Sequence, residues 1–222
     1  MKIELNKQLD KEVYLAFHEA FVGGVDFGKK IRDSHPTITI DNHSKYIDDY
    51  YSAHTEELTG VLGETNQCFD DVKEVLFSEL HEYFNHDYSQ ENYKCYLSIF
   101  DCNPRYIENK SFQVYYKRPF DLRKEVIVHE LTHFAFYDFC HSVGIKDSKA
   151  LWELSEIFNV IFLNLPSIKK AIGAEELLFY PELKVKLDQV RKVWEKQLGP
   201  KEFILISLKV IQYGIGNRSL KK

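Results

Sequence analysis

The stretch from Val126 to Phe136, VIVHELTHFAF, restricts the fold of this chain more than any other segment. It is largely apolar, which predicts a buried helix, yet it carries two histidines four residues apart with a glutamate after the first. Residues four apart on an α-helix lie about 40° from each other around the axis, so His129 and His133 project from one face. An ionised glutamate in such surroundings is costly without a cation or strong partners. The segment therefore predicts a metal-binding helix, the alternative being a core helix with hydrogen-bonded histidines.

The composition and charge of the chain disfavour several classes of function. The chain has 222 residues, of which 44% are hydrophobic and 14% aromatic, and this suits a globular protein with a buried core. A formal net charge of -5 argues against binding to the nucleic-acid backbone, which requires a basic face. No export signal, membrane-length apolar run or C-x-x-C pair stands out in the sequence. These features favour a cytoplasmic protein without nucleic-acid or membrane partners.

The order of patterns along the chain predicts an α+β fold that is mostly helical and has one small antiparallel sheet. Residues 1–90 are expected to be mainly helical, with an amphipathic helix over 66–86 and a short strand at 36–40. Two runs rich in aromatic and β-branched residues, YLSIF (96–100) and FQVYYK (112–117), predict the antiparallel pair. Residues 91–222 form either a second domain or the continuation of one domain.

Helix signals follow the predicted strands. Asp121 is a candidate N-cap for the helix that carries VIVHELTHFAF, and this helix is expected to run to about Cys140. Asp147 or Ser148 can cap the next helix, over 149–164. A charged helix and an apolar C-terminal element complete the expected order.

The two histidines suit zinc because imidazole nitrogens bind this ion at about 2.0–2.1 Å. Glu130 is one step round the helix, too far to ligate with them but able to reach a metal-bound water, as the base of an H-E-x-x-H motif does. A hydrolytic zinc site generally has a third protein ligand. His141 lies too far along the same helix, whereas Glu153 and Glu156 stand in the next helix, in LWELSEIFN. Buried carboxylates in such an apolar run need a partner, and a divalent ion is a natural one.

VIVHELTHFAF and LWELSEIFN together resemble the gluzincin class of zinc metallopeptidases, the thermolysin-like enzymes and their compact minigluzincin relatives. The resemblance covers residues 111–165 and implies a zincin-like fold, in which an edge strand precedes the H-E-x-x-H helix; SFQVYYK occupies that place. It also implies a glutamate ligand on the following helix. The spacing favours Glu153, whereas the local pattern LSEIFN favours Glu156, which we prefer. Asn159 is then expected to hydrogen-bond a ligating imidazole.

The resemblance implies a metalloprotease with one Zn²⁺ per chain and Glu130 as the general base. The edge strand around 113–116 is expected to hold a peptide or protein substrate by β-augmentation. Tyr180 and Tyr137 are candidates for the oxyanion donor of such enzymes. Two alternatives stay open: an inactive or self-inhibited metal-containing binding protein on the same scaffold, and a non-metallic helical interaction protein.

Overall fold

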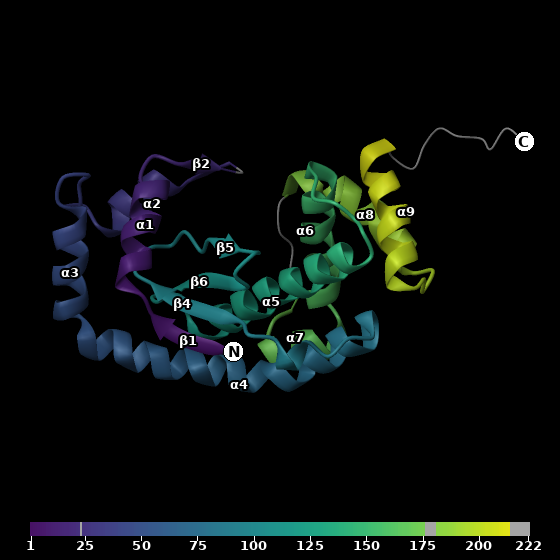
Figure 1. Ribbon diagram of the computed structural model, residues 1–222, viewed down its shortest axis with the longest axis horizontal. Helices are drawn as coiled ribbons and strands as arrows, with labels where there is room; N and C mark the ends of the chain where they lie inside the picture. Colours follow the sequence, from purple (N-terminus) through teal and green to yellow (C-terminus); the bar gives the residue numbers. More distant parts are fainter. Residues whose placement is uncertain (23, 176–180, 214–222) are drawn as a thin grey trace, which may run out of the picture. The chain divides into compact units, whose positions relative to one another are not determined.

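The computed structural model describes residues 1–22, 24–175 and 181–213 (Figure 1). The chain divides into two compact units: Met1–Asp71 with Glu91–Ile127, and Val72–Gln90 with Val128–Lys222. Two long helices each begin in the first unit and end in the second: α4 (Thr55–Phe84) and α5 (Phe120–Ser142). One point of this division, between Gln90 and Glu91, coincides with the expected boundary at residue 90, whereas the points after Asp71 and after Ile127 were not expected.

The first unit holds a four-stranded sheet, a two-stranded sheet and several helices. Its strands are β1 (Lys2–Leu5), β2 (Phe21–Val22), β3 (Val25–Asp26), β4 (Lys94–Ser98), β5 (Arg105–Tyr106) and β6 (Ser111–Tyr115). The helices that precede α4 are α1 (Lys7–Phe17), α2 (Phe27–Ser34) and α3 (His43–Ala53). Helix α1 lies against both α2 and α3.

The strand expected at 36–40 is wrong, because this segment forms turns. The side chain of Asn42 hydrogen-bonds to the backbone of this segment: its Oδ1 accepts a hydrogen bond from the backbone N–H of Thr39 at 2.8 Å, and its Nδ2 donates to the carbonyl of Thr37 at 2.9 Å. Such local bonds from an asparagine side chain offer the backbone an alternative to strand pairing. The alternating threonines and isoleucines therefore do not enter a sheet.

The larger sheet has the order β1-β4-β6-β5 and is mixed, so the expected antiparallel sheet is wrong. Strands β1 and β4 are parallel, and so are β4 and β6, where Leu97 lies opposite Val114. Only β5 runs antiparallel to β6. The connection over residues 99–110 is long enough to return the chain for a parallel pairing, which needs about a dozen residues. A mostly helical α+β fold is confirmed, with a sheet of a different kind.

The expectation that β6 is an edge strand is also wrong, because it lies between β4 and β5. Beyond the short β5, the side of β6 facing away from β4 remains occupied. The backbone N–H of Gln113 donates to the carbonyl of Pro104 at 3.0 Å, and that of Tyr115 donates to Oδ1 of Asn103 at 2.9 Å. β-augmentation needs unpaired backbone groups along an exposed edge, and these two donors of β6 are already used.

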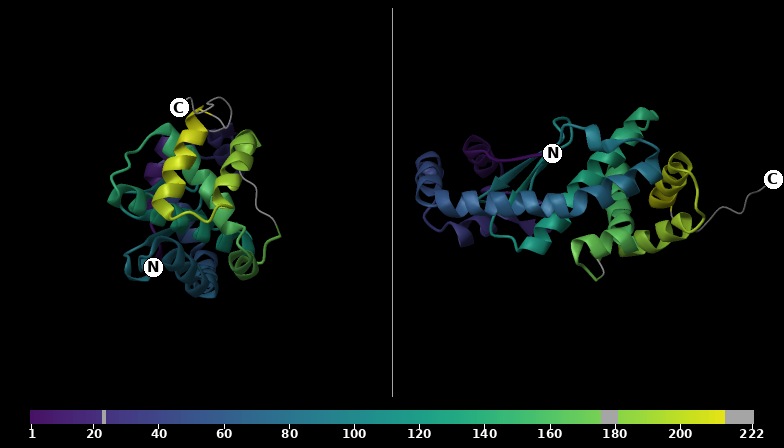
Figure 2. Two further views of the ribbon diagram at one scale, coloured as in Figure 1. Left: turned by 90° about the vertical axis from the view of Figure 1, so that its right-hand side faces the viewer. Right: turned by 90° about the horizontal axis from the view of Figure 1, so that it is seen from below.

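The second unit is built from helices. After the last part of α4 come η1 (Tyr88–Gln90), the last part of α5, α6 (Lys149–Leu163), α7 (Pro166–Ile172), η2 (Pro181–Leu183), α8 (Lys184–Trp194) and α9 (Pro200–Tyr213). Helix α9 lies beside α6 and α8 (Figure 2). Residues Leu154–Leu163 of α6 are all buried, so α6 is the central helix of this unit. Among the described residues, no helix combines the length and the apolar character needed to cross a membrane.

Candidate metal centre

Helix α5 carries the two histidines on a buried surface. Residues 127–137 of this helix are buried except for His129, which is partly exposed, so the buried helix predicted from VIVHELTHFAF is confirmed. The helix begins at Phe120, and Asp121 therefore lies in its first turn instead of at the N-cap. It ends at Ser142, two residues after the expected end.

Helix α6 begins as its sequence predicts. The hydroxyl of Ser148 accepts a hydrogen bond from the backbone N–H of Leu151 at 3.1 Å, which makes Ser148 the N-cap. Eight residues further along the chain, Glu156 is only 3% exposed. Its neighbours Ser155 and Ile157 are buried as well, so the carboxylate is held inside the helical unit.

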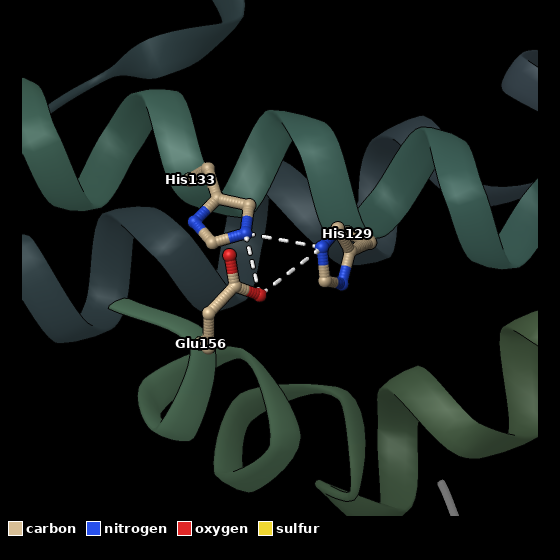
Figure 3. Close-up of side chains that lie close together, drawn as sticks. All are labelled: His129, His133 and Glu156. Carbon is tan, nitrogen blue, oxygen red and sulfur yellow. Dashed lines mark hydrogen bonds and ion pairs between the residues drawn. The ribbon is translucent and has the colours of Figure 1, made fainter. Parts of the chain in front are cut away.

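The two helices direct three ligand atoms toward one point (Figure 3). Nε2 of His129 and Nε2 of His133 are 3.0 Å apart. Oε2 of Glu156 is 3.3 Å from Nε2 of His133 and 3.7 Å from Nε2 of His129. The three atoms form a small triangle, with two corners from α5 and one from α6.

The size of this triangle is compatible with a zinc ion. Ligands placed about 2.0–2.1 Å from an ion in tetrahedral geometry lie about 3.3 Å from one another. The observed separations of 3.0, 3.3 and 3.7 Å fall on both sides of that value. Two neutral imidazoles and one carboxylate are also a donor set found in catalytic zinc sites. The residues present therefore fit a zinc ion in both spacing and chemistry.

Glu153 does not join this group. Its carboxylate forms an ion pair with Lys186 of α8, with Oε2 at 2.6 Å from Nζ. Of the two glutamates that the sequence left open, Glu156 is the one that α6 presents to the histidines. Sequence reasoning missed Lys186, because nothing local links it to a glutamate on another helix.

Glu130 lies next to the three ligand atoms without being one of them. Its Oε1 is 4.0 Å from Nε2 of His129, and the residue is 6% exposed. This agrees with the helical phase, in which the residue after a ligand points to one side of the metal position. Its carboxylate therefore lies beside the group of candidate ligand atoms and not among them.

The other predicted site residues that the structure describes, Asn159 and Tyr137, are not part of the group of candidate ligand atoms. Asn159 is fully buried, but neither of its amide atoms has a hydrogen-bond partner within the described parts of the chain, so the expected bond to an imidazole is not formed. The hydroxyl of Tyr137 and Oγ of Ser155 are 3.2 Å apart, and the ring centroid of Tyr137 is 6.3 Å from that of His133. Tyr180 lies outside the described residues.

His141 takes no part in the centre. Its Nε2 lies 2.9 Å from Oδ1 of Asp147, and 44% of its side chain is exposed.

Comparison of the chain with protein-family models, with curated proteins and with solved structures finds no match. The inferred function therefore depends on the arrangement of α5 and α6 and on the chemistry of the side chains that these helices present.

Proposed function

We propose that this chain is a zinc-dependent peptide hydrolase of the gluzincin type, with the ion held by His129, His133 and Glu156. The observation that carries the proposal is the triangle of ligand atoms, whose sides of 3.0 to 3.7 Å match the spacing around tetrahedral zinc. The order of elements supports it, because the H-E-x-x-H helix precedes the helix with the third ligand. Three protein ligands leave a fourth position for water or substrate, as in catalytic zinc sites.

The reaction would proceed with Glu130 as the proton carrier. When bound, zinc lowers the pKa of a coordinated water to about 7 and polarises the carbonyl of the scissile bond. The carboxylate of Glu130 takes the proton from the attacking water and then gives it to the leaving amine. The 4.0 Å between Oε1 of Glu130 and Nε2 of His129 suits this role, because the base must lie beside the ligands and not among them.

Holding the substrate requires a surface other than β6, since β6 lies between β4 and β5 and the backbone N–H groups of Gln113 and Tyr115 are already hydrogen-bonded.

A cytoplasmic location belongs to the same proposal. It is supported by the four cysteines, none of which forms a disulfide within the described residues, because thiols remain reduced in that compartment.

A metal-containing binding protein without catalysis is the second candidate, and burial of the centre favours it. The side chains of His133 and Glu156 are 0% and 4% exposed, and that of His129 is 14% exposed. A centre this enclosed admits a substrate only if neighbouring residues move aside. Zinc binding alone does not separate the two candidates, but turnover does.

The test measures zinc content and hydrolysis of a peptide library in the same preparations. We expect about one zinc ion per chain in the parent protein, and loss of at least about 100-fold in kcat with zinc content unchanged for Glu130→Gln. Glu125→Gln, on the same helix, is the matched control and should keep both properties.

Three outcomes would contradict the proposal at different points. Full activity of Glu130→Gln would show that Glu130 is not the proton carrier. A purified protein without zinc affinity would show that the three residues do not form a zinc site. A zinc-loaded parent that cleaves no member of the library would favour the binding protein.

A further inference from the structure

A cavity of about 490 Å³ lies in the second unit, away from the metal centre. The end of α4, the junction of α6 with α7 and the junction of α8 with α9 line it. Helices α8 and α9, which supply one wall, lie side by side (Figure 2). The volume falls within the range of about 300–1,000 Å³ that is usual for small-molecule sites.

Aromatic rings form much of the apolar part of this cavity, beside Leu165, Leu198 and Pro200. Tyr83 stacks on Trp194 with ring centroids 4.9 Å apart and planes inclined by 29°. The ring of Phe203 stands almost perpendicular to Trp194, at 84° and 5.3 Å. Phe162 adds a fourth aromatic side chain to the lining. Because the rings pack against one another, the aromatic corner is formed before any ligand arrives.

The charged part of the cavity is entirely acidic. Glu79 and Glu82, on α4, contribute two carboxylates, whereas none of the described residues that line the cavity carries a positive charge. Ser167 of α7 donates a hydrogen bond from its hydroxyl to Oε1 of Glu79 at 2.5 Å, which fixes the position of that carboxylate. Glu82 is exposed and Glu79 is half-buried, so both can meet a ligand that enters from solvent.

We infer that this cavity binds a small organic cation with an apolar body, such as an arylalkylammonium ion. The faces of tryptophan and tyrosine attract cations and also pack against apolar groups. Two carboxylates beside these rings favour a positive ligand and repel an anionic one. The site is separate from the metal centre, and the inference holds whether or not the chain is a peptidase.

The experiment uses three probes of one shape and different charge: phenylpropylamine, phenylpropanol and phenylpropionate. Trp152 and Trp194 are the only tryptophans, so Trp152→Phe leaves Trp194 as the single tryptophan reporter, excited selectively over tyrosine, at the cavity. We expect saturable changes in its emission, with the amine bound most tightly and the carboxylate least. The affinity for the amine should fall with added salt, whereas that for the alcohol should not.

A second experiment removes the two negative charges of the cavity by substitution. The double variant Glu79→Gln/Glu82→Gln should bind the amine about fivefold more weakly and the alcohol unchanged. Equal binding of amine and alcohol by the parent protein, without a salt effect, would overturn the assignment of a cation. The absence of any saturable signal from all three probes would overturn the site itself. The salt series needs no variant, so the inference stays testable if the double variant fails to fold.

Discussion

Glu153 and Glu156 show how a single turn of helix decides the role of a residue. Both are acidic, both stand on α6 and neither is largely exposed. Glu153 meets the ammonium group of Lys186, whereas Glu156 meets two imidazole nitrogens. The first arrangement is already a complete ion pair, and the second is a set of donors for a cation.

The pair provides a matched test of the metal centre. Glu156→Gln replaces an anionic ligand by a neutral amide, so we expect zinc affinity to fall by about 100-fold or more. Glu153→Gln breaks only a partly exposed ion pair and should change zinc affinity less than about threefold. Competition with a chromophoric chelator measures both constants. The reverse order would make Glu153 the ligand and would require α6 to turn.

Asp10 is the other buried acid with a distinct environment, and it lies in the first unit. Its carboxylate accepts hydrogen bonds from the hydroxyls of Ser98 at 2.6 Å and Tyr51 at 2.7 Å, from the backbone N–H of Ile99 at 3.1 Å and from Nε2 of Gln113 at 3.3 Å. Burial nevertheless raises the pKa of Asp10 from 3.8 to about 6, because the four donors only partly offset the loss of water.

The raised pKa of Asp10 predicts an unusual dependence of stability on pH. Between pH values of about 4 and 6 the folded chain binds this proton and the unfolded chain does not, so the free energy of unfolding falls as pH rises through this window. Across this window, the titration of Asp10 lowers the free energy of unfolding by about 3 kcal/mol. Asp10→Asn should remove this slope, measured by urea unfolding at several pH values.

Asp48 is the control for this pH experiment because its shift has the opposite sign. Hydrogen bonds from Lys7 and Lys11 lower its pKa, so whatever stability it contributes is lost as pH falls. Asp48→Asn should therefore leave the slope between pH values of about 4 and 6 in place. An unchanged slope in Asp10→Asn would mean that its carboxylate titrates normally.

At the scale of elements, the N-cap of α6 stabilises the start of the helix that carries Glu156. Ser148 satisfies the N–H of Leu151, which would otherwise lack a partner within the helix. We expect Ser148→Ala to lower the free energy of unfolding by about 1 kcal/mol, measured in urea. Ser52→Ala is the control. Among the described residues, the exposed Ser52 hydroxyl donates only to the carbonyl of Asp48 within its own helix, so its loss should cost less than about 0.5 kcal/mol. Equal losses in the two variants would argue against the cap.

The helices were more predictable from the sequence than the sheet, and the reason is physical. A cap such as Ser148 and a breaker such as Pro166 act within a few residues, so the sequence shows where α6 begins and ends. Strand partners are distant in the chain: β4 pairs with β1, some ninety positions earlier, as Ile3 opposite Cys95 shows. The amino acids of β4 and β6 indicate strands but not their direction, and so their parallel pairing was missed.

The candidate centre was predictable to the extent that it is local. His129 and His133 share a helix face by their spacing alone, and the structure brings their nitrogens together. The choice between Glu153 and Glu156 depends on how α6 is rotated against α5 and on the position of Lys186, which are tertiary facts. The role of Asn159 depends on the same packing, and its amide does not reach either imidazole.

On the scale of the whole molecule, the candidate metal centre and the larger sheet belong to different units. All three candidate ligands lie within Val72–Gln90 and Val128–Lys222, whereas β1, β4, β5 and β6 lie in the other unit. A ligand that binds only the folded state stabilises it by about 2.7 kcal/mol when its concentration is a hundred times the dissociation constant. The bound ligand most directly opposes local opening of the segments that carry the residues it binds.

Zinc should therefore slow amide hydrogen exchange unevenly along the chain. We expect the largest gain in protection over residues 128–163, which include the second half of α5 and all of α6, and a smaller gain in β4 and β6. Exchange followed by mass spectrometry with and without zinc measures both regions in one sample. Glu156→Gln should show little gain in either region at the same zinc concentration, because one of its three ligands is missing. A uniform gain along the chain would mean that the two units open only together, and a gain confined to the strands would place the bound ion elsewhere.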